Sequence, residues 1–454
     1  MGGWVGALAV GIGKMGVLSF LLEVVMAVAR VERLDDKGRG VARVEGKVVF
    51  IEGALPEELV RFSVVEEKRR FARAQLMEVM APSALRVVPP CPLYVRCGGC
   101  DLQHLQVSEQ RAYKQSQWLA QLARLGGVVP ERVGAPLFGE AWEYRYRARL
   151  AVVDGVMGFR TRGGHDVVAV LDCLVLTQAL RGVLPEVALV VAQIGGCVEV
   201  ELHAGDEGVA VGLRLAQGVD VVAVARRVEA MAIEGVAWWL ALGRGDFYPL
   251  AGVLDEQMAK TAFLLRYGLL QKALEIEFSP NDFTQVNREV NRLMVEKVIE
   301  LLALEAGDEV VDFFCGLGNF SLPLAYLGTQ VVAVEGVESM TRKLKRQARM
   351  LGLSKRVRVE CVDLFKPSRE AIRRWGQVDK WLLDPPRAGA KALIEKMGRE
   401  RPSRVVYVSC NPATLARDAG LLVARGYVLQ EALMMDMFVQ TAHIECVAVF
   451  ELGG

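Results

Sequence analysis

The chain has 454 residues and a formal net charge of +1 at pH 7. This length allows roughly two to four domains, each large enough to bury an apolar core. The near-neutral charge excludes a uniformly basic nucleic-acid-binding protein, so any RNA contact must come from local basic patches.

The segment 1–25 is apolar and glycine-rich, and it lacks the basic start of a secretory signal. Gly11, Gly13 and Lys14 interrupt its apolar run. We expect this segment to be a dispensable extension or a mis-assigned start, with Met26 as the true start. No other segment is apolar enough to cross a membrane. We therefore expect a cytoplasmic protein without membrane contact, and no obligate protein partner is evident.

Residues 26–84 read as short strands separated by turns. Apolar and β-branched runs such as 28–32, 38–44 and 47–51 alternate with the turn residues Lys37-Gly38 and Glu45-Gly46. This pattern predicts a small β-barrel domain.

A basic run follows inside the same region. Phe71 lies among Lys68, Arg69, Arg70 and Arg73. These side chains could bind phosphates and stack on a base. A solvated charged strand face is the alternative, and it is the commoner fate of such a run.

Nine cysteines are distributed unevenly along the chain, and three fall within Cys91–Cys100. Cys91, Cys97 and Cys100 share a tight glycine-rich loop, and Cys173 is the candidate fourth ligand. This placement indicates a metal site and not a disulfide framework. Four thiolates suit either a tetrahedral zinc or a [4Fe–4S] cluster.

The central region, 85–275, mixes helical and strand patterns and predicts an α+β domain. A helix is expected over 105–125. The segment 144–150 alternates, which sets Arg145, Arg147 and Arg149 on one strand face. That face is either part of an RNA groove or an exposed sheet face.

Residues 276–454 alternate strands and helices, which predicts a doubly wound, parallel α/β sheet. A glycine-rich turn follows the first strand within 308–320. Glu335, Asp363 and Asp384 end the next three strands. An acidic residue after the second strand is placed to accept hydrogen bonds from ribose hydroxyls. This arrangement resembles a class I, Rossmann-like S-adenosylmethionine methyltransferase.

Cys410 ends a further buried strand, 405–408, and Asn411-Pro412 then opens a helix. The thiol is therefore expected at the carboxyl edge of the sheet, where open α/β sheets bind ligands. The alternative is a buried cysteine that packs as a small hydrophobic residue.

The segments around Cys410, 281–287, 436–445 and the cysteine loop together resemble the RNA uracil-5-methyltransferases of the RumA/TrmA family, closest to their iron–sulfur branch. The resemblance implies that 26–84 is a TRAM barrel, an OB-like RNA-binding module. It implies a [4Fe–4S] cluster on Cys91, Cys97, Cys100 and Cys173. It also implies that the methyl donor, S-adenosylmethionine, is bound by Gln285, Phe314, Asn319, Glu335, Asp363 and Asp384.

The same resemblance makes Cys410 the nucleophile and Glu445 the base. Carbon 5 of uracil is a weak nucleophile, and thiolate addition to carbon 6 activates it. The base then removes the carbon-5 proton so that the cysteine can leave. The uridine must be unpaired or flipped out to be reached. One departure is that Val439 stands where the family usually has proline.

The resemblance implies methylation of a uridine in 23S ribosomal RNA, and alternatives remain. One is a tRNA uracil-5-methyltransferase. Another is methylation of an exocyclic amine, suggested by Asp384-Pro385-Pro386, although Arg387 replaces the stacking aromatic residue and Cys410 would be unexplained. The third is a non-catalytic RNA-binding scaffold with a four-cysteine metal site.

Overall fold

A computed structural model describes residues 26–231, 233–255, 263–399 and 401–453. These residues form two compact units. Unit 1 comprises 26–94, 100–113 and 440–443, and unit 2 comprises 95–99, 114–439 and 444–453. The expected dispensable segment 1–25 lies outside the described residues. Within the described ranges, no helix has the length and apolar character needed to cross a membrane.

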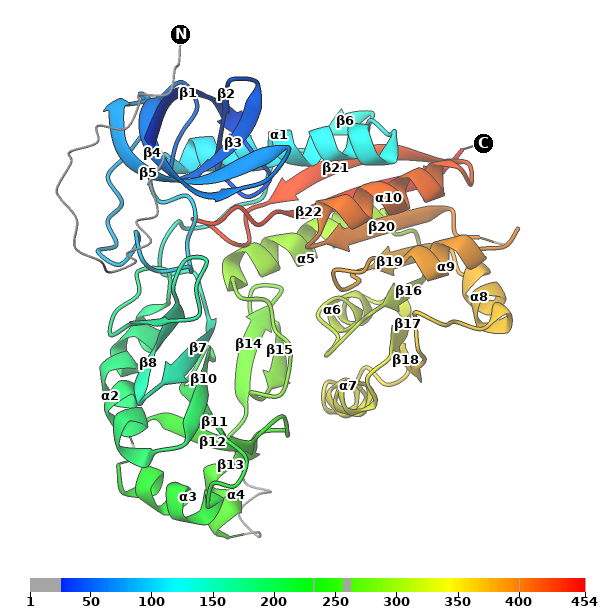
Figure 1. Cartoon of the computed structure of the whole chain (residues 1–454). Coiled ribbons are helices and arrows are strands. Elements are labelled where there is room, and N and C mark those ends of the chain that lie inside the picture. The colour runs from blue at the N-terminus through cyan, green and yellow to red at the C-terminus, as the bar shows by residue number, and fades with distance from the viewer. Residues whose placement is uncertain (1–25, 232, 256–262, 400, 454) are drawn as a thin grey trace, which may run out of the picture. The chain divides into compact units, whose positions relative to one another are not determined.

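Unit 1 is built on a closed β-barrel with the strand order β1-β2-β3-β5-β4 (Figure 1). Its strands are β1 (Met26–Leu34), β2 (Gly40–Val44), β3 (Lys47–Glu52), β4 (Leu59–Glu67) and β5 (Phe71–Ala81). Alternate residues of β1, such as Ala27, Ala29 and Val31, face the barrel core. Gly46 in the β2–β3 turn has φ 82°, which glycine adopts without strain. The predicted barrel is confirmed.

Unit 2 contains a seven-stranded sheet with the order β13-β12-β11-β10-β7-β8-β9. Its strands are β7 (Arg147–Val153), β8 (Val156–Arg160), β9 (Val167–Ala169), β10 (Cys197–Ala204), β11 (Val209–Leu215), β12 (Val236–Leu242) and β13 (Tyr248–Pro249). The helices α2 (Gln178–Ile194), α3 (Val221–Ala230) and α4 (Leu250–Leu254) accompany it. A hairpin of β14 (Leu265–Leu269) and β15 (Leu274–Phe278) follows.

The second sheet of unit 2 has eight strands in the order β18-β17-β16-β19-β20-β22-β21-β6. The strands are β6 (Arg132–Val133), β16 (Glu309–Phe313), β17 (Gln330–Glu335), β18 (Val357–Cys361), β19 (Lys380–Leu383), β20 (Arg404–Ser409), β21 (Tyr427–Met435) and β22 (Glu445–Leu452). The strands from β16 to β20 are parallel, and β22 is antiparallel to both its neighbours. The predicted doubly wound sheet is confirmed.

Helices cover both faces of this sheet. One face packs against α5 (Arg288–Leu302), α6 (Ser321–Tyr326) and α7 (Glu338–Met350). The other packs against α1 (Val107–Gln121), the π-helical turn η1 (Leu122–Gly126), α8 (Arg369–Gly376), α9 (Lys391–Lys396) and α10 (Pro412–Val423). The second core includes Trp118 of α1, which is fully buried. The domain boundaries expected at 84/85 and 275/276 stay predictions.

Candidate active site

Several of the candidate residues gather at one edge of the eight-stranded sheet. Phe314 follows β16, Glu335 ends β17, Asp384 follows β19 and Cys410 follows β20. Because these strands are parallel, their carboxyl ends meet at the same edge. The edge therefore brings acidic groups, an aromatic ring and a thiol together.

The glycine-rich turn after β16 lies next to Glu335. Gly318 has φ 94°, and a Cβ there would lie 2.5 Å from Leu344 Cδ1, so no larger residue fits without displacement. Buried Glu335 accepts hydrogen bonds from the backbone N–H groups of Gly316 at 3.1 Å and Val337 at 2.9 Å. Each carboxylate oxygen retains a second acceptor position, which is what binding of two ribose hydroxyls requires.

Two further carboxyl groups at this edge have raised pKa values. Loss of hydration around the Asp384 carboxyl raises its pKa to about 7. The residue as a whole is half-buried. Burial likewise raises the pKa of Asp312, in β16, to about 7, while the Ser321 hydroxyl donates a hydrogen bond to it. Asp312 was not among the site residues expected from the sequence. An acidic residue inside the apolar run of 310–313 was the available signal, because a buried charge needs a reason.

Asn319 is held by neighbouring side chains. Its amide exchanges two hydrogen bonds with the Asn291 amide, at 2.9 and 3.0 Å, and its Oδ1 accepts a third from the Tyr267 hydroxyl at 3.1 Å. These contacts fix its orientation at the start of α6.

The remaining two candidates differ in exposure. Asp363 is exposed, and its Oδ1 accepts a hydrogen bond from the Phe365 N–H at 2.9 Å, a turn contact. The Phe365 ring lies 5.8 Å from that of Phe314, centroid to centroid. Gln285 is half-buried in the segment before Asn287, which caps α5 by accepting from Val290 N–H at 3.1 Å. Phe365 thus links Asp363 with Phe314, while Gln285 lies in the segment that precedes α5.

Cys410 and Glu445 come together through the pairing of β20 with β22. Ser409 is opposite Cys446 in this antiparallel ladder. One step further, the same register sets Cys410 opposite Glu445. Asn411 begins α10 by accepting a hydrogen bond from the Ala413 N–H at 3.2 Å, which fixes the turn that carries the thiol.

The electrostatics of this pair follow from burial. Burial, and then the charge of Asp384, raise the pKa of Glu445 to about 8. Burial, followed by the charges of Glu445 and Asp384, raises the pKa of the Cys410 thiol to about 11. Exposed Arg387 opposes both shifts with its positive charge. Arg387 therefore favours the thiolate, a role that the sequence analysis did not assign to it.

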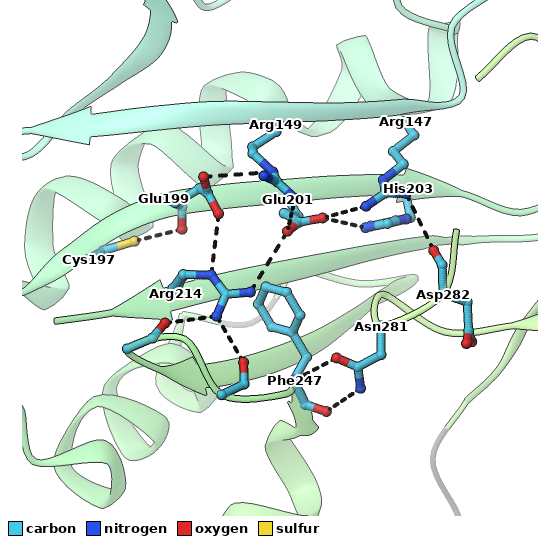
Figure 2. A network of polar contacts seen from close by, with 12 residues as sticks. Arg147, Arg149, Cys197, Glu199, Glu201, His203, Arg214, Phe247, Asn281 and Asp282 are labelled. Carbon is cyan, nitrogen blue, oxygen red and sulfur yellow. Dashed lines mark hydrogen bonds and ion pairs between the residues drawn. The ribbon is translucent and has the colours of Figure 1, made fainter. Parts of the chain in front are cut away.

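The arginine face of β7 is largely neutralised inside its own sheet, as Figure 2 shows. Arg147 and Arg149 donate to the two oxygens of Glu201, on β10, at 3.0 and 3.1 Å. Burial opposes ionisation of Glu201, but contact with His203, whose Nε2 lies 3.4 Å from Oε2, and the two arginine charges together lower its pKa to about 2. Arg145 donates to the Arg147 carbonyl at 2.9 Å. These contacts favour a structural role over an RNA groove.

The basic run of the barrel contains both paired and exposed side chains. Lys68 and Arg73 form ion pairs with Glu66, at 2.8 and 2.9 Å. The Phe71 ring packs edge-on against Phe50 with centroids 5.8 Å apart. Arg69 and Arg70 are exposed, so the RNA-binding interpretation of this run depends mainly on these two residues.

The four candidate metal ligands belong to both units. Cys91 and Cys100 lie in unit 1, and Cys97 and Cys173 lie in unit 2. The Cys97 sulfur accepts from the Gly99 N–H at 3.4 Å, and Cys100 is buried. Over the described ranges, no three or more His, Cys, Asp or Glu side chains are arranged to hold a metal ion. Four thiols are a donor set that suits a thiolate metal centre.

Two family profiles match parts of the chain. The profile described as "tRNA (Uracil-5-)-methyltransferase" matches residues 265–349 and 366–452. The profile described as "TRAM domain" matches residues 28–77. The first covers the glycine-rich turn, Cys410 and Glu445, and the second covers most of the barrel.

Curated relatives match almost the whole chain. The 23S rRNA (uracil(1939)-C(5))-methyltransferase RlmD of Dichelobacter nodosus is 42% identical over 432 residues, covering 91% of this chain and 96% of that protein. The RlmD protein of Neisseria lactamica is 38% identical and covers 95% and 97%.

A solved structure supports the same fold. The Pyrococcus abyssi tRNA (uracil-54, C5)-methyltransferase, in complex with S-adenosyl-L-homocysteine, aligns with a TM-score of 0.72 over 93% of this chain and 100% of that chain, at 24% identity. Identity, coverage and fold agree. The chain belongs to the RNA (uracil-5-)-methyltransferase family of S-adenosylmethionine-dependent enzymes.

Proposed function

We propose that this enzyme methylates carbon 5 of one uridine in 23S ribosomal RNA. The observation that carries the proposal is the identity of about 40% with RlmD relatives over more than nine-tenths of the chain. A ribosomal RNA substrate implies a cytoplasmic site of action. The TRAM barrel suits an RNA partner of this kind.

In the proposed mechanism, Cys410 is the nucleophile. Its thiol releases its proton to solvent, and the sulfur forms a bond to carbon 6 of the uracil ring as the carbon 5–carbon 6 π bond breaks. The ring electrons move to carbon 5, which attacks an electrophilic methyl group. S-Adenosylmethionine supplies that methyl group when bound. Burial and the neighbouring carboxyl groups raise the pKa of the thiol, and the positive charge of Arg387 opposes this shift and so favours loss of the proton.

Glu445 is the proposed base for the second half of the reaction. After methyl transfer, carbon 5 carries both the new methyl group and its original proton. Ionised Glu445 removes the proton, the carbon 5–carbon 6 double bond re-forms, and the sulfur leaves as thiolate. A pKa of about 8 allows Glu445 to accept this proton and to release it near neutral pH.

The cofactor-binding residues are proposed from the same edge of the sheet. Glu335 would hold the ribose hydroxyls, and Phe314 and Asp363 would border the adenosine. Asp384 and Gln285 would orient the methyl donor or the uracil. Asn319, whose orientation is fixed by its hydrogen bonds, would hold the glycine-rich turn between β16 and α6 in place. A uridine inside a helix cannot reach Cys410, so the target would be unpaired or flipped out.

We also propose that Cys91, Cys97, Cys100 and Cys173 bind a [4Fe–4S] cluster. Four thiols are the usual donor set of such a cluster, and the resemblance of the cysteine loop to the iron–sulfur branch of the family supports a cluster over zinc. Protein purified without oxygen should be brown and contain iron and sulfide. Stoichiometric zinc without iron would refute it. The reaction itself moves no electrons, so no step is assigned to the cluster.

The function is tested by assaying methyl transfer to 23S ribosomal RNA and to tRNA, with mapping of the product base. We expect 5-methyluridine in 23S ribosomal RNA. Cys410→Ala should abolish both methyl transfer and the covalent RNA–protein complex. Methylation of tRNA alone would establish the alternative substrate, and carbon-5 methylation by Cys410→Ala would refute the mechanism.

A further inference from the structure

The segment that leads from β21 to Glu445 is held by a buried ion pair. Lys114, on α1, and Asp436, directly after β21, are both fully buried, and Lys114 Nζ lies 2.7 Å from Asp436 Oδ1. The same ammonium donates to the Phe438 carbonyl at 2.9 Å. The Tyr144 hydroxyl donates to the Val439 carbonyl at 2.8 Å. These contacts hold the Asp436 side chain and the backbone carbonyls of Phe438 and Val439.

A gain in folding stability does not by itself explain why this ion pair is buried. Burying two charges removes them from water at a large desolvation cost, and well-packed apolar residues of similar volume often stabilise a fold equally well. Buried polar groups of this kind are best attested where they specify one register of two pairing elements. The pairing of β21 with β22 needs such a contact to specify its register.

The register of β22 is not set by a tight turn. Met435 and Glu445 are opposite each other in the β21–β22 ladder, so the connection runs over the nine residues 436–444. Two-residue hairpin turns fix register by their own geometry, whereas a connection of this length does not. A slip of one residue would turn Glu445 to the other face of the sheet. Contacts along the connection must therefore hold Glu445 opposite Cys410.

We infer that Lys114 is a positioning residue for Glu445, acting through Asp436 and the Phe438 carbonyl. The inference rests on the proposed function, in which Glu445 removes the carbon-5 proton. Cys410 is carried by β20 and α10 and does not depend on this connection. Loss of the Lys114 ammonium should therefore slow proton removal and leave thiol addition nearly unchanged.

The test compares two rates for Lys114→Met, which keeps most of the side-chain volume and removes the charge. Denaturing gels follow formation and decay of the covalent complex with the target RNA. Since a misplacement of about 1 Å can slow a reaction about 100-fold, we expect decay to slow at least about tenfold. Formation should change less than about threefold, and the methylated adduct should accumulate.

Lys380→Met is the matched control. Lys380 is also buried, and its Nζ lies 2.7 Å from Asp308 Oδ2. It begins β19, so it lies at the amino ends of the parallel strands, whereas Cys410 lies at their carboxyl ends. This variant should lose stability while both rates remain at the wild-type values. If both lysine variants slow decay equally, the effect is a general loss of stability and the inference is overturned.

Tyr144→Phe provides a milder variant if Lys114→Met does not fold. It removes one hydrogen bond from Val439, and decay should slow by a smaller factor with formation unchanged. Wild-type decay in folded Lys114→Met, or in Tyr144→Phe when the lysine variant is unfolded, overturns the inference. Absence of any covalent complex in the wild-type enzyme would instead overturn the proposed function.

Discussion

Replacing Glu445 with glutamine should change how protein stability depends on pH. Burial and Asp384 raise the pKa of Glu445 from 4.5 to about 8 in the folded protein. Protonated Glu445 therefore stabilises the folded state. Its contribution to the free energy of unfolding is complete below pH 4.5 and is lost as pH rises through about 8. Since each pKa unit corresponds to about 1.4 kcal/mol, wild-type protein should lose about 4 kcal/mol between pH 5 and 8.5 from this group.

Glu445→Gln cannot ionise, so it should escape this loss. The free energy of unfolding of both proteins is measured by urea denaturation at pH 5, 7 and 8.5, without ligands. The difference between variant and wild type should shift in favour of the variant by about 4 kcal/mol over this range. Asp312 and Asp384 are present in both proteins, so their own titration largely cancels in the difference.

Glu451→Gln, on the same strand, is the control. Its carboxylate is 38% exposed and paired with Arg404, whereas the side chain of Glu445 is buried. If the stability of wild type and Glu445→Gln changes in parallel with pH, Glu445 is not held in a desolvated site. The reasoning that assigns it a raised pKa, and with it a role as a neutral-pH base, would then fail.

Further predictions concern the same site. In wild type, decay of the covalent complex should accelerate as pH rises toward about 8, because Glu445 must be ionised to accept a proton; a flat pH profile would contradict this. Gly318→Ala should weaken S-adenosylmethionine binding and cost about 1–3 kcal/mol of stability, because the new Cβ meets Leu344 at a left-handed backbone position; calorimetry and denaturation measure the two effects. Glu335→Gln should weaken binding of the methyl donor about tenfold, by loss of a charged acceptor. Cys173→Ser should lower the iron content of protein purified without oxygen, and unchanged iron would exclude it as a ligand.

Much of the catalytic sheet was predictable because its strands are local, apolar and bounded by turns. The run at 405–408 and its following turn predicted β20 and its carboxyl edge. The pairing of β20 with β22 could not be read from either segment alone, since register depends on contacts between distant residues. The resemblance to a known family named Cys410 and Glu445, and the ladder supplies the geometry that relates them.

Charged residues were harder to interpret. The sequence shows that Arg147 and Arg149 share a face, but not that Glu201 lies across from them on the neighbouring strand. Lys114 stands in a polar helical segment with the pattern of a solvated surface, and the structure buries it completely. In both cases the partner is far away in the sequence, so composition and periodicity carry no information about it.

The short strand β6 has a consequence for how this enzyme can be divided. β6 pairs with β21 and completes the edge of the catalytic sheet with residues almost 300 positions earlier in the chain. Trp118 and Leu122 contribute to the core on one face of that sheet. A fragment beginning at residue 276 would expose the β21 edge and an apolar surface, and both favour aggregation. Exchanging catalytic halves between relatives therefore requires transfer of the segment 114–137 together with the C-terminal half.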